Sequence, residues 1–233
     1  MNTNKNSYII IYSAILVVVV AFLLAFVYAA LKPQQDINVA LDKKKQILAS
    51  LNIRDLSDAE AAAKYTEVVE CDEIIDTNAA VVNKGEKGGE NAGFKLNSAD
   101  LKEGKLAVYV CNVDGEKKYV IPVYGMGLWG SIWGYIALDA DKNTIYGAYF
   151  DHQGETAGLG AEIKDSKAWQ DFFKGKKIFS ADGAAVAIAV KKASDVKNPA
   201  SEVDAVTGAT LTSDGVSLML QECFSKYVTF LKK

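Results

Sequence analysis

The sequence predicts an α+β protein in which a single N-terminal transmembrane helix leads through a helical stalk into a sheet-containing domain. Three observations support this prediction: an uncharged apolar run near the N-terminus, strand-like segments separated by turn signals, and an amphipathic pattern at the C-terminus. We divide the chain into a transmembrane helix at residues 8–31, a stalk at 32–70 and a domain at 71–233. In that domain we expect an antiparallel sheet and a C-terminal helix.

The composition argues against several classes of protein. The chain has 233 residues, half of them hydrophobic, and a formal net charge of −3, which is unlike a disordered polyelectrolyte. Its 26 basic residues are spread along the chain, so we expect no nucleic-acid partner. Cys71, Cys111 and Cys223 form no C-x-x-C pair, and His152 is the only histidine, so a zinc or iron–sulfur site would lack ligands. We predict three buried thiols and no metal.

The membrane span is the clearest signal in the sequence. Tyr8–Leu31 is a run of 24 residues without a charge. As a helix it would be about 36 Å long, enough to cross a hydrocarbon core of about 30 Å. Val27-Tyr28-Ala29 resembles a signal-peptide cleavage site, but the apolar region of a signal peptide is usually about 7–15 residues. We therefore predict an uncleaved anchor.

Two helices are expected after the span. Pro33 should end the membrane helix, because proline is poorly tolerated beyond the first turn. Gln34–Ile53 then has apolar residues near helical spacing, which indicates an amphipathic helix beside the membrane. Ser57 is placed to cap a further helix at about Asp58–Val69.

Strand signals follow a polar, glycine-rich segment, Lys84–Asp100, which we interpret as a surface loop. Asp114-Gly115 and a turn at Asp139–Asn143 each separate two strand-like runs, which predicts two hairpins. The runs are Lys105–Val113, Lys117–Tyr124, Ile132–Leu138 and Thr144–Phe150. The remaining elements that we expect are a helix at Ser166–Phe173, a strand at Ala184–Val190 and a terminal helix at about Thr212–Leu231.

Hydroxyl side chains crowd the start of this terminal helix, in the stretch D-A-V-T-G-A-T-L-T-S-D-G from Asp204 to Gly215. A turn at Gly208 and a helix cap from Thr212, Ser213 or Asp214 would explain the later hydroxyls. They would not explain why two threonines bracket Gly208 and Ala209, small residues that let a bulky group approach the backbone. The adjoining helix N-terminus would favour a phosphate beside Thr210.

This stretch resembles the signature of the FMN-binding domain family, D-x-x-[ST]-G-A-T, at Asp204, Thr207, Gly208, Ala209 and Thr210. In that family a dedicated flavin transferase joins FMN through its phosphate to the last threonine. The resemblance implies that Thr210 carries FMN covalently and that the other four residues surround the cofactor.

A second resemblance is more specific. Gly125–Leu138 and His152–Gly160 resemble one branch of the family, the C subunits of the sodium-translocating NADH:quinone reductases (Nqr). The single N-terminal span and the helix after the flavin site are also shared. Ala157 departs from the pattern, because proline is usual there, and this changes the stiffness of the loop.

The residues in these stretches suit a flavin site. Leu128, Trp129 and Leu159 could form apolar walls for a planar ring, and the small, turn-prone loop that ends at Gly160 could bring backbone amides to a ligand. The resemblance further suggests that Glu155 holds the loop by accepting backbone N–H groups and that Thr156 hydrogen-bonds the flavin. Trp133 is expected in the sheet core, and His152 has no assigned role.

The resemblance implies an electron-relay subunit of a membrane complex that couples NADH oxidation and quinone reduction to Na⁺ export. The chain has no G-x-G-x-x-G fingerprint and no cysteine cluster, so it should not oxidise NADH by itself. Its expected partners are the membrane and NADH-oxidising subunits of Nqr and, for maturation, a flavin transferase. The family places this domain on the periplasmic face of the bacterial inner membrane, whereas Lys32 and Lys43–Lys45 would favour the cytoplasm by a simple charge count.

Three alternatives remain open at this point. The nearest is the G subunit of the Rnf ferredoxin:NAD reductase complex, which also has one span and a covalent FMN. A membrane-anchored scaffold domain would keep the fold but would need no hydroxyl at Thr210. A free-standing flavoprotein would be active without a membrane complex.

Overall fold

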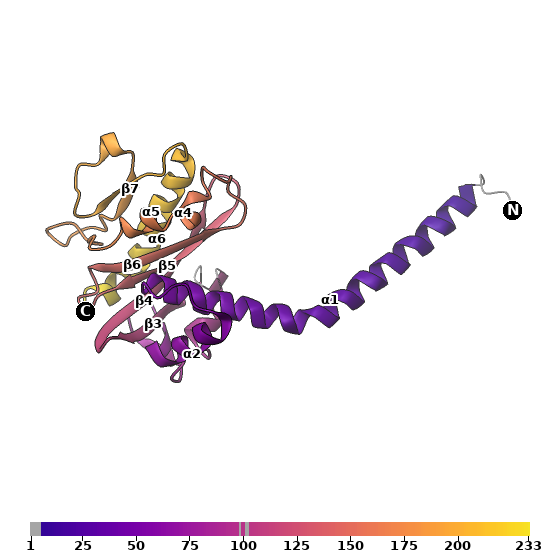
Figure 1. Ribbon diagram of the computed structural model, residues 1–233, viewed down its shortest axis with the longest axis horizontal. Helices are drawn as coiled ribbons and strands as arrows, with labels where there is room; N and C mark the ends of the chain where they lie inside the picture. Colours follow the sequence, from indigo (N-terminus) through magenta and orange to yellow (C-terminus); the bar gives the residue numbers. More distant parts are fainter. Residues whose placement is uncertain (1–5, 98, 101–102) are drawn as a thin grey trace. The chain divides into compact units, whose positions relative to one another are not determined.

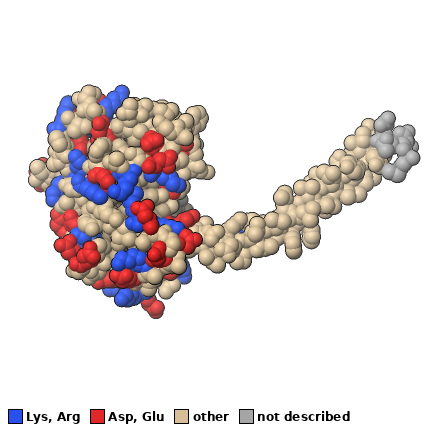
Figure 2. Space-filling model, in the orientation of Figure 1, with Lys and Arg blue, Asp and Glu red and all other residues tan. Residues whose placement is uncertain are grey.

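The first unit of the computed structural model is a long apolar helix. The structure describes residues 6–97, 99–100 and 103–233, and it separates into one unit up to Lys43 and a second, compact unit from Lys44 to Lys233. Helix α1 runs over Asn6–Ser50 (Figure 1). Its apolar part is long enough to span a membrane and has none of its residues buried within the protein. Figure 2 shows no charged side chain along the outer part of this helix.

Pro33 does not end α1, so the expected break between span and stalk is wrong. A proline inside a helix removes one hydrogen bond, here the one to the carbonyl of Ala29. The helix formers on both sides are sufficient to continue the helix across it, a situation often found in transmembrane helices.

The second half of the expected stalk packs within the compact unit. Ile47 and Leu48, near the end of α1, are buried there. Helix α2, Asp58–Val68, begins as expected at Ser57, whose N–H donates to the side chain of Glu60 at 2.9 Å. In the structure, therefore, residues 44–70 belong to the folded unit rather than to a separate connector.

Six antiparallel strands form one sheet in the compact unit, in the order β2-β1-β3-β4-β5-β6. Figure 1 labels β3 to β6 of this sheet. Their bounds are β1 Val69–Ile75, β2 Val81–Lys84, β3 Leu106–Val113, β4 Glu116–Met126, β5 Ser131–Leu138 and β6 Ile145–His152. Both predicted hairpins, β3–β4 and β5–β6, are confirmed. Strands β1 and β2 were not expected. In the predicted loop at Lys84–Asp100, Lys84 ends β2, Gly93–Lys95 form a short helix, η1, and residues 99–100 are helical, while the other described residues are irregular.

The main core lies between the sheet and the terminal helix. Helix α6, Thr210–Leu231, buries Val216, Leu220 and Phe224 in one cluster with inward-facing residues of the sheet such as Ile121. Helices α4, Glu162–Asp165, and α5, Lys167–Asp171, pack on β6. The alternation of side chains along each strand sends the other set to the opposite face, where α2 packs on β1 and β3.

A two-stranded parallel ribbon, β7 Ala189–Lys191 with β8 Glu202–Asp204, lies beside α6. The expected strand at Ala184–Val190 is therefore wrong in its extent, because Val186 makes only an isolated bridge to Phe179. A short helix, η2, at Ala193–Asp195 leads out of β7. The expected helix at Ser166–Phe173 is also shorter, since Ser166 is its N-cap rather than its first turn.

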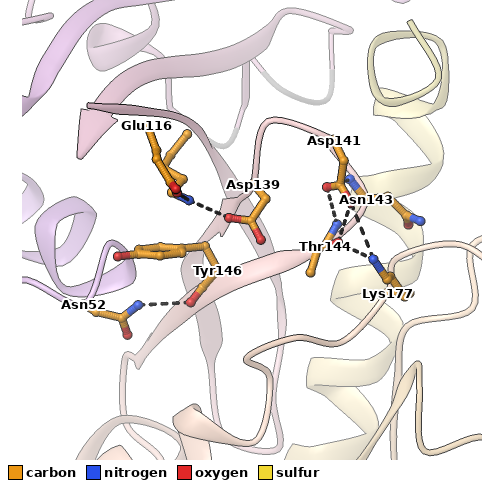
Figure 3. Close-up of polar contacts among 9 residues, drawn as sticks. Asn52, Glu116, Asp139, Asp141, Asn143, Thr144, Tyr146 and Lys177 are labelled. Carbon is orange, nitrogen blue, oxygen red and sulfur yellow. Dashed lines mark hydrogen bonds and ion pairs between the residues drawn. The ribbon is translucent and has the colours of Figure 1, made fainter. Parts of the chain in front are cut away.

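The turn between β5 and β6 is held by the carboxylate of Asp141 (Figure 3). It accepts hydrogen bonds from the N–H groups of Asn143 at 3.0 Å and Thr144 at 2.8 Å, and it pairs with Lys177 at 3.5 Å. Burial opposes its ionisation, but the hydrogen bonds from Thr144 and Asn143 outweigh burial and lower the pKa of Asp141 to about 2.

Strand β6 is an edge strand of the sheet, and Asn52 contacts it. The side-chain amide of Asn52 donates a hydrogen bond to the carbonyl of Tyr146 at 3.0 Å.

Asp141→Asn is expected to reduce the acid sensitivity of folding. A carboxyl with a depressed folded-state pKa stabilises the fold above its unfolded pKa of about 3.9, and this contribution is lost as the pH falls toward about 2. Because the side chain is 49% exposed, solvent screening should limit the effect to about 1 kcal/mol. Urea unfolding of the full chain in detergent at about pH 4 and about pH 2 measures it. An equal loss of stability between these two pH values in the wild type and in Asp141→Asn would contradict this prediction.

Candidate flavin site

Most of the predicted site residues meet in one open pocket of about 200 Å³. It lies between the turn after β4, the loop after β6 and the first turn of α6. Its walls are Leu128, Trp129, Glu155, Thr156, Leu159, Gly160, Gly208, Ala209, Thr210, Leu211 and Thr212. Nine of these residues are predicted from the sequence, whereas Leu211 and Thr212 are not. Asp204 and Thr207, which complete the predicted set, do not line the pocket.

Glu155 joins the three segments that form the pocket. Its side chain is buried, with one oxygen accepting from the N–H of Trp129 at 2.9 Å and the other from the hydroxyl of Thr212 at 2.6 Å. Its own N–H donates to Nδ1 of His152 at 3.1 Å. Both carboxylate oxygens are therefore engaged by the protein, and one of them accepts the backbone N–H of Trp129 in the turn after β4. His152 has a structural part as an acceptor, which the sequence did not indicate.

Glycines make room for this carboxylate. A Cβ atom on Gly160 would lie 2.6 Å from both Oε2 of Glu155 and Oγ1 of Thr212, and one on Gly127 would lie 2.6 Å from Oε1 of Glu155. Gly208 has φ +78°, a left-handed conformation that favours glycine, and it turns the chain into α6. The small residues at these positions thus allow the three segments to approach one another.

The hydroxyls at the start of α6 have distinct roles. Helix α6 begins at Thr210 with Ala209 as N-cap, so the predicted cap from Thr212, Ser213 or Asp214 is wrong. Thr212 donates to Glu155, and Oγ of Ser213 accepts from the N–H of Val206 at 3.1 Å. Helix formation two residues earlier than expected places these two hydroxyls inside the first turn and leaves Thr210, half-buried, on the wall of the pocket.

The N-terminus of α6 also offers backbone donors at the pocket. The N–H groups of residues 210–212 have no carbonyl four residues back within the helix, and the first helical bond outward from the cap is from Ser213 to the carbonyl of Ala209 at 2.9 Å. The partial positive charge of the helix end adds to these donors, so the wall around Thr210 favours an anion.

The apolar walls of the pocket are open to solvent. Trp129 is 69% exposed, Leu211 60%, Leu128 48% and Leu159 44%, although side chains of this size are normally buried. Trp129 is therefore a rim residue rather than part of the core. Trp133, expected in the core, is half-buried and donates from Nε1 to Oε1 of Gln46 at 3.2 Å.

The remaining predicted residues lie near the pocket without lining it. Asp204 ends β8 with its side chain exposed, and its carbonyl accepts from Nε1 of Trp169 at 2.8 Å. Thr207 is exposed in the turn before α6. The three cysteines are buried and free, as predicted, and burial raises the pKa of Cys71 to about 11.

The pocket fits part of a flavin. Exposed leucine and tryptophan side chains suit a planar aromatic ring, and backbone donors at the helix end suit a phosphate. A volume of about 200 Å³ is smaller than that of most pockets that enclose a ligand, so it would hold a ring that stays largely open to other molecules.

Comparison with known proteins first defines the class. The model of the FMN-binding domain family matches residues 127–225, a range that contains all the walls of the pocket.

Particular relatives then define the family. The C subunit of the Na(+)-translocating NADH-quinone reductase of Vibrio vulnificus is 33% identical over 200 residues, covering 80% of this chain and 78% of its own. The corresponding C subunit of Haemophilus ducreyi is also 33% identical, over 220 residues, covering 87% of this chain and 83% of its own.

The crystal structure of the C subunit from Parabacteroides distasonis is 41% identical with a TM-score of 0.79 and covers 87% of this chain and 98% of its own. The structure from Shewanella oneidensis is 25% identical with a TM-score of 0.67 and covers 84% and 99%. The chain belongs to the family of Na(+)-translocating NADH-quinone reductase C subunits, which are parts of an oxidoreductase complex.

Gly215→Ala is expected to destabilise the fold and to disturb the pocket, although alanine normally favours a helix by about 1 kcal/mol over glycine. A Cβ atom at Gly215 would collide with the carbonyl oxygen of Met126 at the end of β4, so α6 or the strand must move. Overpacking of this kind costs about 1–3 kcal/mol, which outweighs the helix preference. Urea unfolding measures the change, with Gly154→Ala as control because nothing lies within 4 Å of its added Cβ. A stabilised Gly215→Ala variant would contradict the prediction.

Proposed function

We propose that this chain is the flavin-carrying electron-relay subunit of a sodium-translocating NADH:quinone reductase, with FMN joined by a phosphoester bond to Thr210. Family membership supports the complex, and the FMN-binding domain match supports the cofactor. The covalent bond, the point of attachment and the coupling to Na⁺ export are parts of the proposal.

One observation carries the choice of Thr210. Among the hydroxyls of the motif, Thr212 and Ser213 are buried and engaged in hydrogen bonds, and Thr207 lies outside the pocket. Thr210 lines the pocket at the first position of α6 and makes no side-chain hydrogen bond to any described residue. Its hydroxyl is therefore the one available both to an incoming phosphate and to a modifying enzyme.

The residues around the pocket have definable tasks in an electron relay. Bound FMN supplies the redox chemistry, accepting and donating electrons through its ring. The apolar walls at Leu128, Trp129 and Leu159 would orient the ring, while Glu155 fixes the distance between two of these walls. Thr156, on the same loop, would supply a hydrogen bond at the edge of the ring. Because the walls are open, partners could approach the ring without displacing it.

The wider setting follows from the family. Helix α1 would anchor the subunit in the bacterial inner membrane, with the compact unit on the periplasmic side. The membrane and NADH-oxidising subunits of the complex would exchange electrons with the flavin, and a flavin transferase would install it. Covalent attachment suits a cofactor that must remain bound while its partners change. Family membership favours this setting over the Rnf-type alternative.

Peptide mass mapping tests the proposal. The full chain is produced with and without a flavin transferase. Mass spectrometry then measures the masses of the peptides that contain Thr207, Thr210 and Thr212. When the transferase is present, we expect an FMN-sized addition on Thr210 and flavin fluorescence that persists after denaturation. Without the transferase we expect neither. An unmodified peptide, from a transferase that is active on a control substrate, would refute the attachment and leave the scaffold alternative.

A further inference from the structure

A second pocket, of about 480 Å³, lies on the other side of Thr210 and contains three lysines. We name it the lysine pocket. It is lined by Val190, Lys191, Lys192, Asp195, Lys197, Thr210 and Asp214. Of the residues that the structure describes, Thr210 alone lines both this pocket and the flavin pocket described above. A group attached to its hydroxyl would therefore stand at the border between the two.

Hydrogen bonds to Glu202 hold the segment that carries the three lysines of the lysine pocket. Glu202, which is buried, accepts from Nζ of Lys191 at 2.5 Å and from the backbone N–H groups of Lys197 at 2.5 Å and Asn198 at 2.7 Å. The hydrogen bonds from these N–H groups and from Lys191 lower the pKa of Glu202 to about 2, so this carboxylate stays charged near neutral pH. Glu202 thereby fixes the segment from residue 191 to residue 198.

A hydrogen bond between β7 and α6 fixes this segment against the helix. The N–H of Val190 donates to Oγ of Ser217 at 3.1 Å, so the middle of β7 is held about two turns along α6 from its start. The lysines that follow Val190 in sequence are thus kept beside Thr210 rather than on a loose loop.

The two pockets beside Thr210 differ in charge. Among the described residues, the walls of the flavin pocket include the carboxylate of Glu155 and no basic side chain. In the lysine pocket, Lys191 is paired with Glu202, but neither Lys192 nor Lys197 forms an ion pair with any residue that the structure describes. Asp195 and Asp214 also line the lysine pocket, and their two negative charges equal in number the two positive charges of Lys192 and Lys197. Even so, of the two pockets, only the lysine pocket offers cations to an anion at Thr210.

We propose that the lysine pocket holds the phosphate of the flavin nucleotide esterified to Thr210, with Lys192 and Lys197 as its counter-charges, while the ring lies in the flavin pocket. This inference rests on the proposed attachment at Thr210. A phosphodiester carries one negative charge and only oxygen acceptors, which two ammonium groups and the free N–H groups of a helix end can satisfy. The apolar ring has no such need and favours the leucine-lined side.

Phosphorus NMR of the full, flavin-bearing chain in detergent tests this placement directly, because the phosphodiester contains the nucleus observed. The Thr210→Ala chain provides the blank that identifies signals from bound lipid. The variants are Lys192→Gln/Lys197→Gln, the charge-conserving Lys192→Arg/Lys197→Arg, and a control, Lys87→Gln/Lys95→Gln. The control removes two exposed lysines that do not line the pocket. Peptide mass mapping of each protein reports whether Thr210 carries FMN.

We expect the phosphodiester signal of the wild type to be displaced from its position in urea. The signal of the Lys192→Gln/Lys197→Gln variant should move toward that position. The signals of the Lys192→Arg/Lys197→Arg variant and of the control should stay at the wild-type position. Loss of attachment in the Gln variant alone, restored in the Arg variant, would also support the proposal. An unchanged signal in a Gln variant that carries FMN would overturn the lysine placement and leave the attachment intact. Absence of FMN from wild-type Thr210 would instead refute the attachment.

A phospholipid headgroup has the same phosphate chemistry and is a second source of ligand. Vesicles of phosphatidylglycerol added to the Thr210→Ala chain separate the two sources. Binding that is lost in Lys192→Gln/Lys197→Gln, together with an unchanged phosphodiester signal in the flavin-bearing chain, would assign the pocket to lipid and overturn the proposal.

Discussion

Thr210→Ala is expected to abolish covalent flavin and, with it, electron transfer through the assembled complex, while leaving the fold intact. The hydroxyl is the proposed nucleophile of attachment, and alanine has none. Because Thr210 is half-buried and its side chain bonds to no described residue, the substitution should change stability by no more than about 0.5 kcal/mol. Flavin fluorescence on denaturing gels and quinone reduction by the complex are the measurements.

Two further variants make this prediction specific. Thr210→Ser keeps a hydroxyl at the first position of α6 and should retain attachment, whereas Thr207→Ala removes a hydroxyl that lies outside the pocket and should have little effect. Flavin that stays on the Thr210→Ala chain, or disappears equally in Thr207→Ala, would disprove the assignment. Normal electron flow in a flavin-free Thr210→Ala complex would show that the subunit is a scaffold.

Removing the Glu155 carboxylate is expected to be the most destabilising of the site substitutions. Glu155→Ala leaves the N–H of Trp129 and the buried hydroxyl of Thr212 without their acceptor. Hydrogen bonds to a charged group contribute about 1.5–3 kcal/mol each, so we expect a loss on the order of 3 kcal/mol. Urea unfolding monitored by tryptophan fluorescence measures it, with the exposed Glu86→Ala as control.

Glu155→Gln separates the charge from the hydrogen bonds. The amide can still accept from Trp129, and Oγ1 of Thr212 can reverse its part and accept from the amide, so stability should fall by only about 1 kcal/mol. Neutralising a carboxylate beside the flavin pocket should raise the midpoint potential of the bound flavin, because a nearby negative charge disfavours added electrons. A potential equal to that of wild type and of Glu86→Gln would contradict this placement of Glu155 beside the ring.

The open rim of the flavin pocket explains why a tether is needed. The four most exposed apolar side chains, Leu128, Trp129, Leu159 and Leu211, cover little of any ring that they contact. Affinity for a small ligand depends on how much of it is buried, and a pocket of about 200 Å³ buries only part of a flavin. A covalent bond at the helix end supplies the retention that this shallow pocket cannot.

The sequence alone determined much about this protein. A long uncharged run predicts the apolar helix because length and hydropathy are local properties, and Asp114-Gly115 predicts a hairpin because the turn type demands those residues. The motif from Asp204 to Thr210 and the resembling stretches before it identified the family, and nine of the residues chosen from them line one pocket. Their identities are carried by short segments, so they could be found without a structure.

Only the tertiary structure decided how those segments meet. Strands β1 and β2 have weak local patterns and form by pairing with β3 and with each other. Residues 44–70 belong to the compact unit, in which Ile47 and Leu48 are buried. The starting point of α6 depends on the hydrogen bonds of Ser213 with Val206 and of Thr212 with Glu155. Helix propensity describes single residues and does not include such contacts. The lysine pocket likewise arises because the parallel ribbon β7–β8 brings residues 191–197 beside Thr210. Local chemistry is set by neighbours in the chain, whereas a site shared by distant segments exists only after the chain has packed.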